Sequence, residues 1–202
     1  MRAWTKVLFA SLATTGAPAL AEVTASSDSG FVVERSVFVP ASAEASWRVL
    51  LQPGTWWQNA HTWSGNAANM SIEARAGGCF CEVLPRTKGA SPATRGVAEH
   101  MRVIHAAPQR MLRMSGALGP LQAEAAQGTM TITLTPVAGG AVGTTIRMVY
   151  VVGGYMRLKP QQIAPAVDGV LGAQLAGLAA RLGVPRSIPV PAPVPPPAAA
   201  KP

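Results

Sequence analysis

The patterned part of the chain ends in one long helical segment that follows an unbroken series of strand patterns. From Pro160 to Leu182, apolar residues recur at spacings of three and four, which predicts a helix with one apolar stripe. The stripe consists of Ile163, Val167, Val170, Leu171, Leu175, Leu178 and Leu182. Such a stripe needs a sheet to cover, so we expect an α+β protein whose last helix packs on a β-sheet.

A second face of the same helix is built from small residues. Each glycine inside a helix costs roughly 1 kcal/mol relative to alanine, so their presence needs a reason. These residues are Gly169, Gly172, Ala173, Ala176 and Ala180. We expect this side either to touch a neighbouring segment closely or to leave space beneath it.

The start of the chain predicts export. Arg2 and Lys6 form a basic beginning, residues 7–12 are mainly apolar, and residues 19–21 read Ala-Leu-Ala, a small-residue cleavage site. We therefore expect a signal peptide over residues 1–21, cleaved after Ala21, and a periplasmic or secreted mature protein.

Two further segments flank the expected domain. Residues 22–30 are small and polar, which predicts a flexible leader. Residues 184–202 are rich in proline and alanine, which predicts a disordered, extended tail that serves as a spacer or, alternatively, docks weakly to a partner. The folded domain is then expected over residues 31–183, and 202 residues with 49% hydrophobic content suit one domain.

The charge of the mature chain is basic but dispersed. The full chain has 17 Lys and Arg against 9 Asp and Glu, and removal of the two bases in the signal leaves 15 against 9, or +6. The bases are scattered along the sequence, which argues against a nucleic-acid partner. A solvated basic surface explains this charge, and the alternative is an anionic partner such as a membrane surface or a carboxylate ligand. After the signal, we expect no transmembrane helix.

Seven segments have strand character, and short turn-forming sequences separate most of them. Connections this short predict antiparallel neighbours. In residues 128–136, Met130, Ile132 and Leu134 alternate with threonines, which predicts one buried and one wet face. Ser42 is placed to cap a short helix after the first strand. The strand segments are residues 31–39, 70–75, 79–84, 95–106, 110–115, 128–136 and 143–152.

This order of elements resembles the SRPBCC superfamily, which includes START-type lipid-binding domains, polyketide cyclase and dehydrase relatives, and Aha1-like proteins. The local matches are Val37-Phe38-Val39-Pro40-Ala41 followed by Trp47, Ala76-Gly77-Gly78 before Cys79-Phe80-Cys81-Glu82, and Ala107-Pro108 between strands. The resemblance implies a helix-grip fold: a seven-stranded antiparallel curved sheet, a short helical pair after the first strand, and a long C-terminal helix across the sheet. It also implies an apolar cavity between helix and sheet, but no single activity.

That implied cavity suggests a hydrophobic ligand of lipid or polyketide type. Aromatic residues near the helical pair and methionines on successive strands suit such a ligand, although ordinary core packing explains them as well. The candidate ligand-binding residues are Trp56, Trp57, Trp63, Ile72, Met101, Met114, Ile132, Met148, Tyr150, Val167 and Leu171.

Cys79 and Cys81 are the only cysteines, and export exposes them to oxidising conditions. On a regular strand, residues two apart lie roughly 6.5 to 7 Å from Cα to Cα, near the upper limit for a disulfide, with parallel side chains. This favours two buried thiols over a disulfide. A Cys/Cys/His site with His100 depends on the hairpin register, and we expect neither a metal nor a cofactor.

No nucleophile–histidine–acid signature is found in the sequence. The strand region carries Glu73, Glu82 and Glu99, and of these Glu99 joins His100 and Tyr150 as candidates for proton transfer. The sequence does not decide whether the chain is an enzyme. We expect an exported binding protein for a hydrophobic small molecule. The alternatives are a cyclase- or dehydratase-like enzyme and an envelope interaction module that uses the tail.

Overall fold

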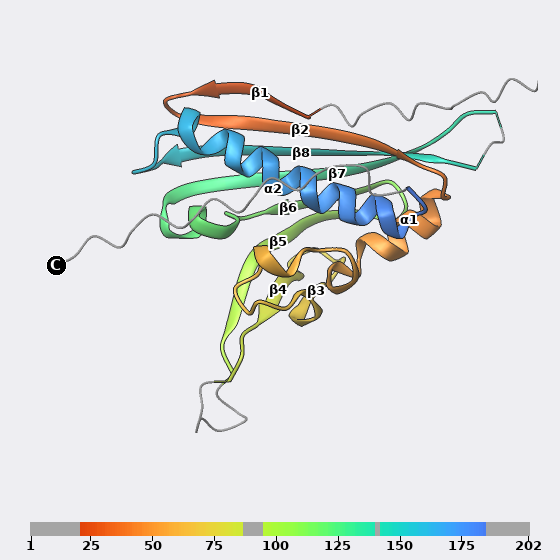
Figure 1. Ribbon diagram of the computed structural model, residues 1–202, viewed down its shortest axis with the longest axis horizontal. Helices are drawn as coiled ribbons and strands as arrows, with labels where there is room; N and C mark the ends of the chain where they lie inside the picture. Colours follow the sequence, from red (N-terminus) through yellow and green to blue (C-terminus); the bar gives the residue numbers. More distant parts are fainter. Residues whose placement is uncertain (1–20, 87–94, 140–141, 185–202) are drawn as a thin grey trace, which may run out of the picture.

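The computed structural model describes residues 21–86, 95–139 and 142–184, and Figure 1 shows their arrangement. The expected signal peptide and tail lie outside these residues, apart from Ala21 and Val184. The strands are β1 (Ala21–Ser27), β2 (Gly30–Val39), β3 (Met70–Ile72), β4 (Cys79–Val83), β5 (Val97–Ala107), β6 (Met111–Ser115), β7 (Ala125–Pro136) and β8 (Thr144–Tyr155). The helices are α1 (Ala43–Leu50) and α2 (Pro160–Arg181), and the 3-10 turns are η1 (Pro53–Thr55), η2 (Asn59–His61), η3 (Ala67–Asn69) and η5 (Gly119–Ala123).

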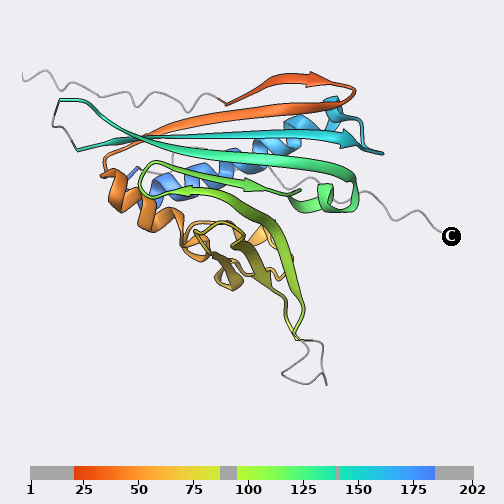
Figure 2. The same cartoon turned by 180° about the vertical axis from the view of Figure 1, so that it is seen from behind.

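The strands form one antiparallel sheet in the order β1-β2-β8-β7-β6-β5-β4-β3. Figures 1 and 2 show α2 on one face of this sheet and the end with β3, β4 and β5 bending away from the plane of β2 and β8. The predicted helix-grip architecture is therefore confirmed, with eight strands instead of seven. The predicted alternation in β7 is confirmed too, because Met130, Ile132 and Leu134 are buried.

The flexible leader expected over residues 22–30 is wrong, because most of it forms β1. Backbone pairing with β2 places Val23 opposite Val33, and Val23 packs against the core. The sequence does not predict this strand because its residues are mostly small and polar. Val23 is the one larger apolar residue, so the alternation that marks a strand is absent.

Packing of α2 on the sheet is tight. Leu171, Leu175 and Leu178 are buried, which confirms the predicted stripe. A Cβ added at Gly172 would overlap the Arg35 guanidinium, and one at Gly177 would overlap the backbone carbonyl oxygen of Trp56. The small residues of α2 therefore allow close approach of neighbouring groups.

One ion pair connects this helix to the sheet. Arg35 of β2 donates from Nε and Nη2 to the two carboxylate oxygens of Asp168, both at 2.7 Å. Both side chains are largely buried, and a bidentate geometry of this kind fixes orientation as well as distance. The glycine at position 172 leaves the space that the guanidinium occupies.

The apolar cavity expected between helix and sheet is not seen in the described part of the chain. Two hollows lie at the surface, one around Asp28 and the start of α2 and the other around Pro108 and Arg110. Side chains such as Met148 and Ile132 are 1–2% exposed and fill the interior. The physical reason is that the small face of α2 is used for contact with Arg35 and Trp56.

By length and composition alone, α2 is apolar enough to cross a membrane, contrary to our expectation that no such segment follows the signal. Its apolar composition has another explanation in this fold. The helix packs on the sheet through Leu171, Leu175 and Leu178, and core helices of folded domains have the same composition.

Candidate functional site

A buried polar cluster lies where the sheet bends, beneath the segment from Trp56 to Ala67. Its centre is Glu82 of β4, which is 0% exposed, beside His100 of β5, which is 5% exposed. Among the described residues, Glu82 is the only acidic residue that is buried as a whole residue. A charge without solvent must be paired and hydrogen-bonded, so its surroundings identify the site.

A β-bulge brings His100 to this position. Phe80 pairs with Met101 and Cys81 pairs with Glu99, so His100 is an extra residue on β5. As a result His100 and Met101 are both buried although they are adjacent in sequence. Without the bulge, one of the two would face solvent.

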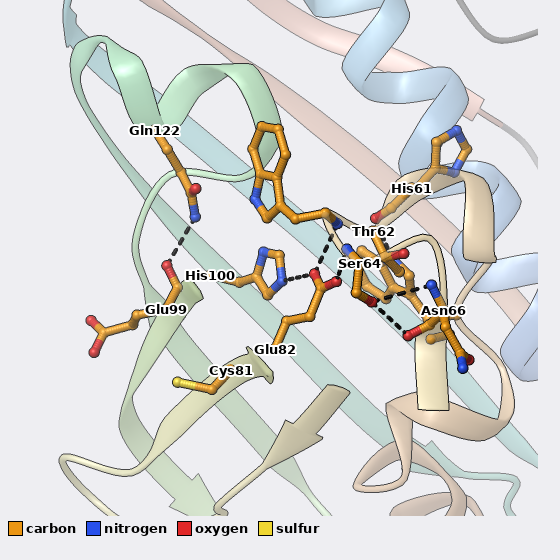
Figure 3. A network of polar contacts seen from close by, with 12 residues as sticks. His61, Thr62, Ser64, Asn66, Cys81, Glu82, Glu99, His100 and Gln122 are labelled. Carbon is orange, nitrogen blue, oxygen red and sulfur yellow. Dashed lines mark hydrogen bonds and ion pairs between the residues drawn. The ribbon is translucent and has the colours of Figure 1, made fainter. Parts of the chain in front are cut away.

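The carboxylate of Glu82 accepts three hydrogen bonds. The backbone N–H of Trp63 donates at 3.0 Å, the backbone N–H of Ser64 donates to the other oxygen, and Nε2 of His100 lies 2.9 Å away (Figure 3). Burial alone would raise the pKa of Glu82. The hydrogen bonds from Ser64, Trp63 and His100 outweigh burial and hold that pKa below its ordinary value.

The charge state of Glu82 fixes the proton on His100. An ionised carboxylate accepts hydrogen bonds and cannot donate them, so Nε2 of His100 must carry its proton. The other ring nitrogen, Nδ1, has no hydrogen-bond partner among the described residues. In the neutral imidazole, Nδ1 can therefore accept a hydrogen bond from a ligand or take up a proton.

A second buried polar side chain holds the same segment from the other side. Gln174 of α2 is fully buried; its Oε1 accepts from the backbone N–H of Gln58 at 2.8 Å and its Nε2 lies 2.7 Å from Nδ1 of His61. Partial burial lowers the pKa of His61, which favours its neutral form as the acceptor. The segment over the site is thus attached to both α2 and β4.

Aromatic rings continue from this segment to the histidine. Trp56 contacts Trp57, Trp57 meets the edge of Phe80, and Phe80 lies 5.3 Å from His100 between ring centroids. Trp63 is different, because its side chain is 54% exposed while its backbone N–H is bound to Glu82. A large apolar ring exposed to solvent, on a residue whose backbone is bound to the buried polar pair, is the feature of this site that packing does not explain.

The segment after β6 forms the opposite boundary. Gln122 donates from its side-chain amide to the backbone carbonyl of Glu99 at 2.9 Å (Figure 3). The Tyr150 hydroxyl donates to the carbonyl of Gly116 and accepts from the N–H of Leu118. Burial raises the pKa of Tyr150 to about 12, so the phenol is neutral and both of its hydrogen-bonding functions hold this segment in place.

The structure separates the three candidates for proton transfer. His100 lies in the buried cluster. The Glu99 side chain is exposed and binds Arg102, on the face opposite to His100, and Tyr150 is engaged with residues 116–118. Of the three, His100 is the one that the structure places in the cluster with its second nitrogen unpaired.

The ligand-binding candidates are divided in the same way. Trp63 is exposed above the cluster and Trp57 contributes to its aromatic side. Ile72 and Val167 are half-buried. The others are packed in the filled interior: Trp56, Met101, Met114, Ile132, Met148, Tyr150 and Leu171.

The sequence analysis did not place Glu82 or Gln174 in a site. Each carries a recognisable signal. Glu82 shares strand parity with Phe80, and Gln174 interrupts the apolar stripe of α2 beside Leu175. A polar residue at an inward position indicates a required hydrogen bond.

Cys79 and Cys81 form a disulfide with a Cα–Cα distance of 5.3 Å, so the favoured interpretation as two free thiols is wrong. The regular-strand estimate fails because β4 is not regular between the two cysteines: its register with β5 shifts between Phe80 and Cys81. Both cysteines are half-buried on the outer face of the sheet, and Figure 3 shows the Cys81 sulfur pointing away from Glu82. No group of three or more metal-binding side chains occurs in the described ranges.

Comparison with known proteins gives a family and a fold. The sequence profile of the family described as polyketide cyclase / dehydrase and lipid transport matches residues 30–183. A Rhodobacter sphaeroides structure is 19% identical, with 81% of this chain and 97% of that chain covered and a TM-score of 0.51. A Mesorhizobium loti structure is 18% identical, with coverage of 74% and 94% and a TM-score of 0.50. These likenesses show the fold alone, and no curated protein matches.

Proposed function

We propose, from the premise that this chain belongs to the polyketide cyclase / dehydrase and lipid transport family, that it is an exported protein that binds an amphipathic small molecule. The family and its fold suggest ligand binding. The proposed site is the buried polar cluster with Trp63 above it, because the interior between α2 and the sheet is filled.

The observation that carries the proposal is that Trp63 exposes its ring to solvent while its backbone N–H binds Glu82 of the buried Glu82–His100 pair. An aromatic ring offers a large apolar area to the hydrophobic part of a ligand. The unpaired Nδ1 of His100 offers a hydrogen bond to a polar group of the same ligand. A fatty acid or a hydroxylated aromatic polyketide has both features.

The test is a fluorescence titration with two probes, dodecanoate and 1-anilinonaphthalene-8-sulfonate. We expect Trp63→Ala to weaken binding about tenfold, since removing one central aromatic contact costs about 1 to 2 kcal/mol. Phe38→Ala is the matched control, because Phe38 is 53% exposed but lies on β2, on the sheet and not in this segment. Equal losses in both variants, or none in Trp63→Ala, would contradict the proposed site.

A second function, proton transfer on a carbonyl compound as in a cyclase or dehydratase, is favoured by one observation. Glu82 holds the proton on Nε2 of His100, which leaves Nδ1 as a base. The probe is 2,4-pentanedione in deuterium oxide, with proton exchange followed by NMR. The enzyme hypothesis expects faster exchange than in buffer, lost in His100→Ala and kept in His105→Ala; identical rates for all proteins exclude it for this probe.

A further inference from the structure

The Cys79–Cys81 disulfide lies outside the proposed binding site. The residues of β4 alternate, with Phe80 and Glu82 buried and both cysteines half-buried on the other face of the sheet. That face carries no helix in the described structure (Figure 2). The sulfur atoms therefore belong to residues that solvent and another molecule are able to reach.

This disulfide is poorly suited to a purely structural role. It joins residues separated by two positions in one strand. A crosslink stabilises a protein mainly by restricting the unfolded chain, and this restriction is smallest for the shortest loops. The two residues are also already held by the pairing of β4 with β5. Exposed disulfides with little structural purpose are the labile and catalytic ones.

The neighbouring strand makes the two sulfurs unequal. Cys79 pairs directly with Arg102 and Cys81 pairs with Glu99, and these two partners form an ion pair of 2.6 Å between Nη2 and Oε2. Cross-strand partners have Cβ atoms about 5 Å apart on the same face. A thiolate on Cys79 would therefore form beside a guanidinium, whereas one on Cys81 would form beside a carboxylate.

We propose that Cys79–Cys81 is a thiol–disulfide exchange site that oxidises a dithiol, with Cys79 as the leaving sulfur. A thiolate of the dithiol attacks Sγ of Cys81, the S–S bond breaks, and its electron pair passes to Sγ of Cys79 next to Arg102. The second thiol of the partner then loses its proton and attacks the mixed disulfide, which releases Cys81. The dithiol becomes a disulfide, the protein disulfide becomes two thiols, and two protons pass from the partner to the cysteines.

The experiment uses the full chain isolated in air and dithiothreitol as the dithiol. Reduction is stopped with acid, and free thiols are counted by mass after maleimide labelling, while circular dichroism follows the fold. We expect no labelling before reduction, two labels after it, and an unchanged fold. Labels without reductant, or reduction only after added denaturant unfolds the protein, would overturn the proposal.

The assignment of Cys79 is tested by the rate of reduction. Arg102→Gln should slow it about threefold, because a less stabilised leaving thiolate departs more slowly. Arg147→Gln is the matched control. Arg147 is also exposed and forms an ion pair with a glutamate, Glu34, but this pair joins β8 and β2, away from the cysteines. Glu99→Gln keeps the guanidinium and should react at least as fast as the unaltered protein. An unchanged rate in Arg102→Gln would overturn the role given to Cys79.

Discussion

The two ends of the sheet are covered by different physical means. At one end, α2 lies on β1 and β2 through buried leucines and the close approach of Arg35 at Gly172, with one ion pair between Arg35 and Asp168. At the other, the segment from Trp56 to Ala67 is attached to Glu82 and Gln174 by hydrogen bonds. Apolar burial is lost when water enters, whereas water can replace a hydrogen bond at small net cost. Under the proposed function, the polar end is therefore the end whose cover a ligand would displace more easily.

The largest expected effect comes from removing the central acceptor of the polar end. Glu82→Ala leaves the N–H groups of Trp63 and Ser64 and the His100 ring without their acceptor, so we expect the free energy of unfolding to fall by about 3 kcal/mol. Denaturant unfolding measures this. Glu34→Ala, which removes an exposed partner of Arg147, should cost no more than about 1 kcal/mol. Similar losses in both would mean that the polar end is not held by Glu82.

The close packing of α2 against its neighbours is tested by adding one methyl group. Gly177→Ala forces the methyl against the backbone oxygen of Trp56, which cannot move alone, so we expect a loss of about 2 kcal/mol even after the gain in helix propensity. Gly172→Ala meets the end of the Arg35 side chain, which yields more easily than backbone, and should cost less than Gly177→Ala. Thermal unfolding compares the two. If Gly177→Ala stabilises the protein, α2 and the Trp56 segment are not in close contact.

A smaller effect is expected for the disulfide. Replacing both Cys79 and Cys81 by serine removes a crosslink that restricts very few residues, so the free energy of unfolding should fall by about 1.5 kcal/mol or less. Denaturant unfolding of the oxidised protein and the double variant tests this. A loss above about 3 kcal/mol would show that the bond is structural, contrary to the exchange role.

The smallest effect concerns acid. The pKa of Glu82 is lower in the folded protein than its ordinary 4.5, so its stabilisation is present above that value and is lost as pH falls through the folded pKa. Glu34 and Glu124 also have lowered pKa values through hydrogen bonds from Arg147 and Arg157, but both arginine side chains are exposed, so salt weakens these pairs. Unfolding is therefore measured between pH 6 and 3 in about 1 M salt. The slope should be shallower in Glu82→Gln; an equal slope would contradict the lowered pKa.

The two ends also differ in how well the sequence predicts them. The apolar stripe of α2 and the alternation of β7 are predicted from the periodicity of apolar residues. Both are confirmed, because the burial of apolar side chains alone determines which face of each element turns inward. At the polar end, the β5 bulge turns His100 to the buried face of the sheet. A single extra residue of this kind is not visible in the alternation of apolar and polar residues along the sequence. The disulfide lies at the same irregularity, because the register shifts between Phe80 and Cys81. The sequence could not show whether the small residues of α2 make close contacts or leave a cavity. The groups they contact, Arg35 and the backbone of Trp56, are distant in sequence.

The central claim is that a ligand binds beneath Trp63 and not between α2 and the sheet. The most direct test is an NMR titration with dodecanoate that follows the Trp63 indole N–H and the methyl groups of Met130 and Met148, two core residues that are 1% exposed. We predict a saturable shift of the Trp63 signal with both methionine signals unchanged. Saturable shifts of Met130 and Met148 with an unchanged Trp63 signal would contradict the claim and place the ligand in the core.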